Sequence, residues 1–324
     1  MAGARRDAIA TAAETDLSPF ADPAARPLDP AKFRDPNVTA KGEPRAEVAL
    51  RRLETLWINT GTLCNLACKS CYIESSPRND ALVYPTLAEV EAYLVEAAAL
   101  GTREIGFTGG EPFMNRDCPA MIAAALGRGF EVLVLTNAMR PMRRFAAALL
   151  ALPRERLTFR VSLDHHSRAV HEAERGAGTW AKALDGLGWL AANGFRVAVA
   201  GRQLPGESAA AAQAGYEALF AALGLPVDGL VLFPEMDASA DVPEITDACW
   251  SILGVSPDAM MCASSRMVVK AKGAKRPHVV ACTLLPYDPQ FALGDSLAAA
   301  SRPVRLNHPH CARFCVLGGA SCSG

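Results

Sequence analysis

Two things are missing from this sequence: a surplus of charge of either sign and a long hydrophobic run. The 324 residues hold 33 Lys and Arg against 34 Asp and Glu, so the formal net charge is -1. Without a basic surplus there is no electrostatic argument for binding a nucleic-acid backbone. Apolar stretches such as residues 96–100 and 209–214 are far shorter than the roughly 20 apolar residues that span a bilayer. We therefore expect neither nucleic acid nor a membrane as a partner.

The first residues also lack the features of a targeting segment. Arg5 and Arg6 precede an alanine-rich stretch that contains Glu14 and Asp16 and has no long apolar core, which argues against a signal or transit peptide. Half of the residues are hydrophobic and 21% are charged, an ordinary composition for a globular chain with a sizeable core. We expect a cytoplasmic enzyme.

Ten cysteines are present, and three of them lie close together in the chain. Cys64, Cys68 and Cys71 form a C-x3-C-x2-C run that is followed by Tyr72. A disulfide framework is disfavoured, because clustered cysteines in a chain of cytosolic type more often bind metal or act in catalysis. A structural zinc site usually has four N or S ligands in paired spacing, which a lone triplet fits poorly. Three thiolates on one loop instead indicate a 4Fe-4S cluster with one iron left free to bind a molecule other than protein.

Apolar runs alternate with helix-like segments from residue 53 onward. The expected strands are residues 55–60, 104–107, 131–135, 157–163, 196–200 and 229–233. The expected helices are one that begins at Pro85-Thr86 and those over residues 119–128, 142–150, 180–193 and 209–223. This regular alternation, without hairpin signals, predicts an α/β fold with a parallel sheet covered by helices. Ligands of such folds lie at the carboxyl ends of the strands. The residues at or just after these ends include Cys64, Gly109, Asn137, Ser162 and Arg202.

Together with two further motifs, the cysteine run resembles the radical S-adenosylmethionine (SAM) superfamily. The further motifs are Gly109-Gly110-Glu111-Pro112, after the next predicted strand, and Ser162-Leu163-Asp164. The resemblance implies a partial (βα)6 TIM-like barrel. It also implies that SAM chelates the open iron and that one electron from the cluster cleaves SAM to methionine and a 5'-deoxyadenosyl radical, which abstracts a substrate hydrogen. An external electron donor such as flavodoxin or ferredoxin is implied as well.

The same resemblance assigns residues to the SAM site. Gly109 and Gly110 permit close backbone approach to a ligand, and in the family this turn meets the SAM amino group; an ordinary turn after a strand is the alternative. Ser162 and Asp164 offer a hydroxyl and a carboxylate to ribose or to the methionyl carboxylate. For Asp164, a turn cap is nearly as good an interpretation.

Three further residues complete the predicted cofactor site. Arg175 resembles the arginine that forks onto the SAM carboxylate in related enzymes, because a guanidinium matches a carboxylate through two hydrogen bonds; a solvated surface arginine is the alternative. Tyr72 is expected near the adenine or the cluster, or as core filling, and Glu111 belongs to the glycine motif. His165 and His166 are expected to face solvent, and no catalytic base is assigned.

The C-terminal part carries a second group of cysteines, namely Cys262, Cys282, Cys311, Cys315 and Cys322. This part resembles the twitch module, the shortened relative of the SPASM domain, which implies an auxiliary 4Fe-4S cluster. The expected ligands are Cys262, Cys282, Cys311 and Cys315, with Cys322 as the main substitute. Buried thiols without metal are disfavoured, because the last residues are too polar and glycine-rich for a core. Cys118 and Cys249 are expected to be ordinary thiols.

The predicted organisation has three parts. Residues 1–52 form an irregular N-terminal extension with at most one helix, residues 53–236 a radical SAM core, and residues 237–324 a twitch- or SPASM-like auxiliary module. The predicted function is abstraction of a substrate hydrogen by the 5'-deoxyadenosyl radical, in the modification of a peptide or protein. Two alternatives stay open: oxidation of a small-molecule metabolite by the same chemistry, and a non-catalytic iron-sulfur electron carrier or redox sensor.

Overall fold

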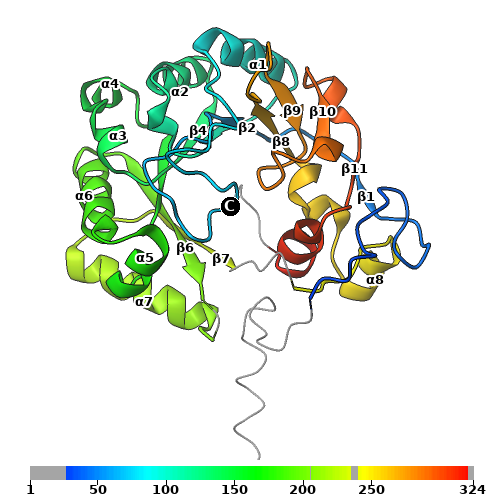
Figure 1. Cartoon of the computed structure of the whole chain (residues 1–324). Helices are drawn as coiled ribbons and strands as arrows, with labels where there is room; N and C mark the ends of the chain where they lie inside the picture. Colours follow the sequence, from blue (N-terminus) through cyan, green and yellow to red (C-terminus); the bar gives the residue numbers. More distant parts are fainter. Residues whose placement is uncertain (1–26, 205, 235–239, 320–324) are drawn as a thin grey trace, which may run out of the picture.

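The computed structural model describes residues 27–204, 206–234 and 240–319, and Figure 1 shows its sheet curling around a central space with helices on the outside. The sheet has nine strands in the order β10-β9-β8-β2-β3-β4-β5-β6-β7. Neighbouring strands from β8 to β7 are parallel. The architecture is thus the predicted partial TIM-like barrel, extended at one edge.

All six predicted strands are present, and they lie side by side in chain order. They are β2 (Thr55–Asn59), β3 (Glu104–Thr108), β4 (Glu131–Thr136), β5 (Leu157–Ser162), β6 (Arg196–Gln203) and β7 (Gly229–Pro234). Every residue of β2 is buried, because helices cover one face of the sheet and the barrel interior lies on the other. A parallel sheet covered on both faces gives continuous apolar runs, which is why these strands were predictable.

Three strands of the sheet were not predicted. β8 (Ser265–Val269) pairs in parallel with β2, and β9 (His278–Val280) and β10 (Ala292–Gly294) continue the sheet in antiparallel fashion. Two of them have only three residues, too few to show a period of hydrophobicity. As a result, the cysteine-rich C-terminal part shares one continuous sheet with the barrel.

Helices line the outside of the barrel. They are α1 (Leu87–Ala99), α2 (Cys118–Gly127), α3 (Arg140–Arg143), α4 (Ala146–Leu150), α5 (Arg168–Arg175), α6 (Thr179–Ala192) and α7 (Ala209–Leu223), while α8 (Ala248–Leu253) lies in the C-terminal part. Thr86 and Glu89 form a capping box at the start of α1. The single helix predicted over 142–150 is two short helices, and α5 was not predicted. Within the described ranges, no helix is both long and apolar enough to cross a membrane.

The described part of the N-terminal extension, residues 27–52, is free of helix and lies against the C-terminal part of the chain. β1 (Glu47–Val48) pairs antiparallel with β11 (Val304–Arg305). The extension is therefore tied to the C-terminal part of the chain by backbone hydrogen bonds, although its own sequence has little periodicity.

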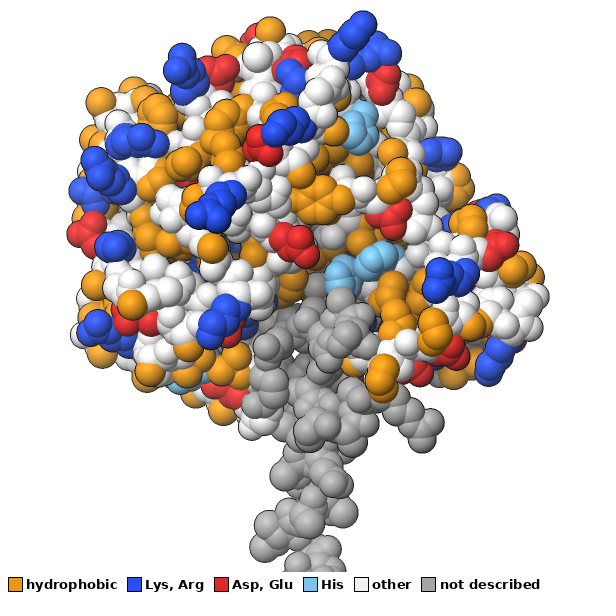
Figure 2. All heavy atoms as spheres, viewed as in Figure 1, with side chains coloured by type: hydrophobic (Ala, Val, Ile, Leu, Met, Phe, Trp, Pro, Cys, Tyr) orange, Lys and Arg blue, Asp and Glu red, His pale blue; other side chains and the backbone are white. Residues whose placement is uncertain are grey.

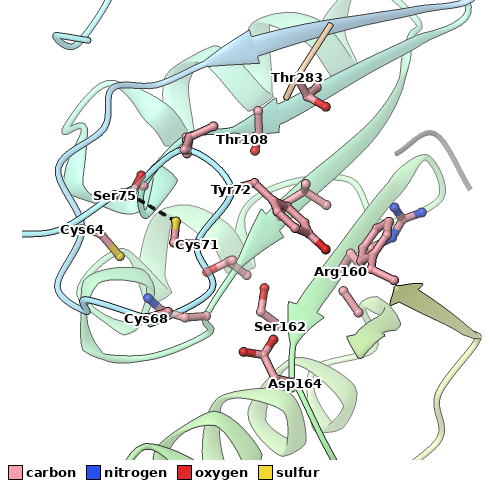
Figure 3. Close-up of a pocket in the computed structure, with 18 of the residues that line it drawn as sticks. Cys64, Cys68, Cys71, Tyr72, Ser75, Thr108, Arg160, Ser162, Asp164 and Thr283 are labelled. Atoms are coloured by element: carbon pink, nitrogen blue, oxygen red, sulfur yellow. Dashed lines mark hydrogen bonds between the residues drawn. The ribbon is translucent and has the colours of Figure 1, made fainter. Parts of the chain in front are cut away.

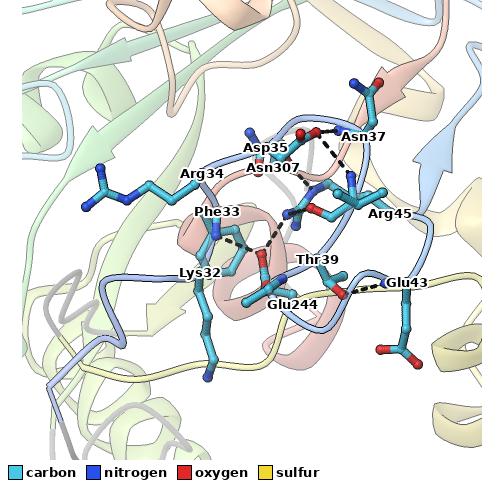
Figure 4. A network of polar contacts seen from close by, with 12 residues as sticks. Lys32, Phe33, Arg34, Asp35, Asn37, Thr39, Glu43, Arg45, Glu244 and Asn307 are labelled. Atoms are coloured by element: carbon cyan, nitrogen blue, oxygen red, sulfur yellow. Dashed lines mark hydrogen bonds and ion pairs between the residues drawn. The ribbon is translucent and has the colours of Figure 1, made fainter.

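Glu244 connects the C-terminal part to the N-terminal extension at a second place, shown in Figure 4. Its carboxylate accepts hydrogen bonds from the backbone N–H of Phe33 at 2.7 Å and of Ala40 at 2.6 Å. It also forms an ion pair with Arg45 at 2.6 Å, in which both side chains are buried. Burial raises the pKa of Glu244, but the Ala40 N–H and Arg45 outweigh burial, so that the pKa lies below its usual value of 4.5.

A Glu244→Gln variant is expected to unfold more easily at neutral pH, by about 3 kcal/mol, because Arg45 would remain buried without a counter-charge. Since folding lowers the pKa of Glu244, its contribution is complete above the unfolded value of 4.5 and is lost as the pH falls through the folded value. The difference between wild type and variant should therefore shrink in acid. The test is to unfold both proteins with denaturant at neutral pH and at about pH 3, and to compare the difference in their free energies of unfolding.

The matched control is Asp258→Asn, which removes a carboxylate from the exposed ion pair with Arg51. Exposed pairs contribute little to stability, so this variant should unfold like the wild type. Equal unfolding of Glu244→Gln and wild type at neutral pH would show that the buried pair does not hold the extension.

Candidate functional site

A cavity of about 190 Å³ lies at the carboxyl ends of the parallel strands. Figure 3 shows that its labelled residues come from the cysteine loop and from neighbouring strand ends. The predicted site residues that line it are Cys64, Cys68, Cys71, Tyr72, Gly109, Gly110, Ser162, Asp164 and Arg175. Residues separated by more than 100 positions in the chain thus share one space, as the parallel topology requires.

The three cysteines of the loop after β2 face this cavity (Figure 3). Two of their sulfur atoms accept backbone hydrogen bonds: Cys64 Sγ from the N–H of Leu66 at 3.4 Å, and Cys71 Sγ from the N–H of Ser75 at 3.3 Å. Such bonds favour a thiolate. They also fix the loop in the conformation that presents the sulfurs.

Burial makes two of these thiols costly to ionise on their own. It raises the pKa of Cys64 to about 12 and also raises that of Cys68, although Arg175 lowers the latter in part. A coordinated metal reverses this balance, because its positive charge displaces the thiol proton. Three sulfurs on one loop that face the same cavity are therefore a donor set that fits an iron-sulfur cluster.

The middle of the loop is held from two sides. Glu174 on α5 accepts a hydrogen bond from Ser70 Oγ at 2.7 Å, and its backbone carbonyl accepts one from the Lys69 N–H at 3.0 Å. On the other side, Arg202 Nη2 donates to the Ser70 carbonyl at 2.7 Å. The segment between Cys68 and Cys71 is thus anchored to α5 and to β6.

Asp164 and two arginines form a buried charged group beside the cysteines. Arg175 donates two hydrogen bonds to Asp164, at 2.8 and 2.9 Å, and Arg202 Nε lies 3.5 Å from the same carboxylate. Burial raises the pKa of Asp164, but the two arginines outweigh it, so the pKa is lowered and the carboxylate is ionised. The Arg202 guanidinium also lies 4.7 Å from the centre of the Tyr72 ring.

The geometry places Arg175 at the cavity. Its side chain is 12% exposed and lines the cavity, so it is not a solvated surface arginine. The fork of its guanidinium is occupied by Asp164 in this structure. Arg202 completes the group, and its place at the end of a predicted strand was the only sign of it in the sequence.

The glycine pair serves the packing of two loops. A Cβ on Gly109 would lie 2.5 Å from the Gly61 carbonyl oxygen, and one on Gly110 would lie 2.3 Å from the Leu63 carbonyl oxygen. Gly109 also has a φ of +136°, which side chains of L-residues rarely adopt. The pair is therefore required for the approach of the β3 loop to the backbone that precedes Cys64.

Glu111 has a different place from the one predicted. Its carboxylate accepts hydrogen bonds from Thr136 Oγ1 and from the Asn137 N–H, both at 2.8 Å. Burial raises its pKa to about 7, against the effect of these donors. Among the described residues that line the cavity Glu111 is missing, whereas Thr136 and Asn137 are present. It therefore positions the end of β4 from behind and does not contact the cavity.

The expectation that His165 and His166 face solvent was wrong for His165, which is buried. Its Nε2 lies 3.3 Å from a carboxylate oxygen of Glu207, and its Nδ1 accepts a hydrogen bond from the Ser167 N–H at 2.9 Å. The ligand atoms of the two histidines and Glu207 lie within 4.8 Å of one another. Because Nδ1 accepts this hydrogen bond, the tautomer that fits both contacts carries the proton on Nε2 and donates it to Glu207.

The second group of cysteines gathers next to the cavity. Cys262 lies in a short 3-10 helix (Met261–Ala263), Cys282 follows β9, and Cys311 and Cys315 lie one turn apart in the π-helix Cys311–Leu317. Burial raises the pKa of Cys311, and the three other thiols raise it further, so all three lie within Coulombic reach of Cys311. Cys322 lies outside the described residues.

Two contacts join this second group to the cavity. Thr283 and Leu284, which follow Cys282, line the cavity. Phe314, which lies between Cys311 and Cys315, packs edge-on against Tyr72 at 6.3 Å. Tyr72 thus lies between the two groups of cysteines.

Comparison with known families agrees with this geometry. The model of the radical SAM superfamily matches residues 58–210, which run from β2 through the cysteine loop to the start of α7. These residues are a radical SAM domain. The matched range contains the three cysteines, the glycine pair and the charged group of the cavity, so most of the cavity lining belongs to that domain.

Curated relatives match this domain over part of their length. The chain is 30% identical to an AdoMet-dependent heme synthase of Nitratidesulfovibrio vulgaris over 131 residues, which are 39% of this chain and 34% of the relative. It is 31% identical to the antilisterial bacteriocin subtilosin biosynthesis protein AlbA of Bacillus subtilis over 138 residues, which are 42% of this chain and 30% of AlbA. The match thus spans about a third of the length of these relatives.

Among solved structures, SuiB of Streptococcus suis bound to its precursor peptide SuiA superposes with a TM-score of 0.59. The superposition covers 78% of this chain and 65% of SuiB, at 13% sequence identity. At this identity the likeness concerns the fold. It extends beyond the radical SAM domain, because 78% of the chain is more than residues 58–210 contain.

Proposed function

We propose that this protein is a radical SAM enzyme whose reaction takes place in the cavity at the carboxyl ends of β2–β7. The observation that carries the proposal is the convergence of three thiols, a glycine pair and a charged group on that one space. Cys64, Cys68 and Cys71 would hold a 4Fe-4S cluster with one open iron, which together with SAM supplies, after one-electron reduction, a 5'-deoxyadenosyl radical for hydrogen abstraction. A one-electron donor and a cytoplasmic location belong to the same proposal.

The residues of the chain have distinct parts in this scheme. Gly109 and Gly110 leave their backbone open to the SAM amino group. Ser162 offers a hydroxyl at the end of β5, and Arg175, held by Asp164, presents positive charge to the SAM carboxylate. Tyr72 closes the cavity towards the second group of cysteines and limits the access of water to the reacting atoms.

The test of this function is the formation of 5'-deoxyadenosine from SAM by anaerobically reconstituted, reduced protein. The proposal expects 5'-deoxyadenosine and methionine in equal amounts, measured by mass spectrometry over many turnovers. A protein with a complete and reducible cluster that forms neither product, with or without candidate substrates, would instead support an electron carrier or redox sensor.

An Arg175→Ala variant is expected to bind SAM about 10- to 100-fold more weakly, because a charge-assisted hydrogen bond contributes about 1.5–3 kcal/mol. Its iron content should stay unchanged. Arg168→Ala is the control, since Arg168 lies on the same helix but is exposed and pairs only with Glu172. Equal SAM affinity of the Arg175→Ala variant and the wild type, measured by isothermal titration, would remove Arg175 from the SAM site.

The second part of the proposal is one auxiliary 4Fe-4S cluster held by Cys262, Cys282, Cys311 and Cys315. The closeness of the other three thiols to Cys311 supports it. A second redox centre at this place lies next to Thr283 and Leu284 of the cavity wall. It would be suited to accept the electron that remains when a substrate radical is oxidised.

Iron content tests the auxiliary site. The wild type should hold roughly eight irons per chain after reconstitution, and Cys282→Ala or Cys311→Ala roughly four, since each cubane contains four. Cys249→Ala is the control. The Cys249 thiol hydrogen-bonds to Thr246 and belongs to neither of the two groups of cysteines. A wild-type content of roughly four irons would dismiss the auxiliary cluster.

We propose a peptide or protein as the substrate. The support is the likeness of the fold to SuiB bound to a precursor peptide and the similarity to AlbA of bacteriocin biosynthesis. The similarity to a heme synthase favours the alternative of a small metabolite. Deuterium transfer into 5'-deoxyadenosine separates them: transfer from deuterated peptides supports the proposal, and transfer from deuterated small molecules alone contradicts it.

A further inference from the structure

A hollow in the surface lies beside Asn65, the residue that follows the first cysteine of the loop. Its lining residues are Asn65, Met114, Arg140, Pro141 and Arg144. Asn65 directly follows Cys64, and its side-chain oxygen accepts a hydrogen bond from Asn137 Nδ2 at 2.9 Å. Because Asn137 lines the cavity and Asn65 lines the hollow, this hydrogen bond joins the walls of the two spaces.

The wall of this hollow carries positive charge. Arg140 and Arg144 are exposed and lie four residues apart at α3, so that they project from one side of the helix. Arg116 is also exposed and comes two residues after Met114. In Figure 2, Lys and Arg side chains lie along the left side of the molecule, where Figure 1 places α3. This local surplus contrasts with the net charge of -1 of the whole chain.

The neighbouring charges do not neutralise these arginines. Asp185 pairs with Arg143, whose guanidinium lies over Trp189, on the side of α6. Asp117 accepts a hydrogen bond from the backbone N–H of Leu87 at the start of α1. Arg140 and Arg144 therefore present their charge to solvent.

Tyr84 connects the hollow to the cysteine loop. Its ring packs against the backbone of Gly61, where a Cβ would lie 2.5 Å from the ring. The phenol lies within Coulombic reach of both Arg144 and Cys64. Tyr84 therefore lies close to the start of the cysteine loop and feels the charge of Arg144.

We propose that the hollow between the cysteine loop and α3 is the docking site of a small acidic one-electron carrier protein, seated by Arg140 and Arg144 over Asn65. The inference rests on the proposed function, which needs one electron per SAM cleaved. The reduced carrier is oxidised by one electron, and the cluster held by Cys64, Cys68 and Cys71 is reduced by the same electron, with no bond or proton transferred. Electron tunnelling falls off exponentially with distance, so the carrier must approach close to a ligand. Complementary charge steers that approach and weakens with salt.

The experiment measures binding and electron transfer separately, with a bacterial flavodoxin as the probe. Binding of flavodoxin to the reconstituted protein is followed by biolayer interferometry at low and high ionic strength, and cluster reduction by the bleaching of its visible absorption. The reductants are reduced flavodoxin and, in parallel, dithionite. The test variant is Arg140→Glu combined with Arg144→Glu. The control variant, Arg34→Glu combined with Lys41→Glu, makes the same change of charge at exposed residues of the N-terminal extension.

The test variant should bind flavodoxin at least about tenfold more weakly at low salt and lose most of the salt dependence. Reduction by flavodoxin should slow accordingly, while reduction by dithionite stays at the wild-type rate. The docking site would be overturned if flavodoxin binding weakened equally in the test and control variants. It would also be overturned if cluster reduction in the test variant slowed equally with flavodoxin and with dithionite. Binding of an RNA oligomer as tight as that of flavodoxin, and lost in the test variant, would overturn the choice of partner. Binding needs neither SAM nor substrate, so its failure is distinguishable from a failure of the proposed function.

Discussion

A Cys71→Ala variant is expected to lose 5'-deoxyadenosine formation by at least about 100-fold, because the cluster would have lost one of its three protein ligands. Cys71 lies at the end of the cysteine loop, where its sulfur accepts the Ser75 N–H at 3.3 Å. Alanine keeps the backbone and removes only the sulfur. The measurement is 5'-deoxyadenosine formed per chain under reducing, anaerobic conditions, together with iron content and a melting curve.

Cys249→Ala is the matched control for this variant. Cys249 is half-buried, as Cys71 is, and lies in α8 away from the cavity. It should retain wild-type formation of 5'-deoxyadenosine. The iron content of Cys71→Ala should fall while the auxiliary irons remain. Substantial SAM cleavage by Cys71→Ala would show that the loop does not hold the reactive cluster.

A Gly110→Ala variant is expected to form 5'-deoxyadenosine about 100-fold more slowly. A displacement of a catalytic group by about 1 Å has an effect of this size. The added Cβ would lie 2.3 Å from the carbonyl oxygen of Leu63 and 2.7 Å from that of Thr62. Both are backbone atoms and cannot move out of the way as a flexible side chain would. The chain before Cys64 must therefore shift and carry the first cysteine with it.

Gly188→Ala is the control for added volume. Gly188 lies within α6, and its added Cβ would meet only Leu225 Cδ2, at an ordinary 3.7 Å. Alanine is favoured over glycine in a helix by about 1 kcal/mol, so this variant should be as stable as the wild type or more so, with full activity. Wild-type activity and iron content in Gly110→Ala would contradict the role assigned to the glycine pair.

Much of the site was predictable because parallel strands bring their carboxyl ends to one edge. Once the six apolar runs were placed, Cys64, Gly109 and Ser162 had to lie near one another. The residue types then named the chemistry, since clustered thiols bind iron. The prediction was weakest where a residue type has several roles: Glu111 belongs to the glycine motif, yet its carboxylate binds Thr136 and Asn137 behind the cavity.

The sequence of this protein determined the order of its six predicted strands and the clustering of Cys64, Cys68 and Cys71, because hydrophobic periodicity and thiol clusters are local properties. It did not determine which charged side chains pair. Asp164, Arg175 and Arg202 come from three elements, and their hydrogen bonds depend on strand register and on burial that excludes water. The extension of the sheet by β8–β10, which places the second cysteine group beside the cavity, likewise depends on contacts distant in the chain. Such contacts produce no hydrophobic period in the sequence, because they stabilise the protein only once separate segments have folded against each other.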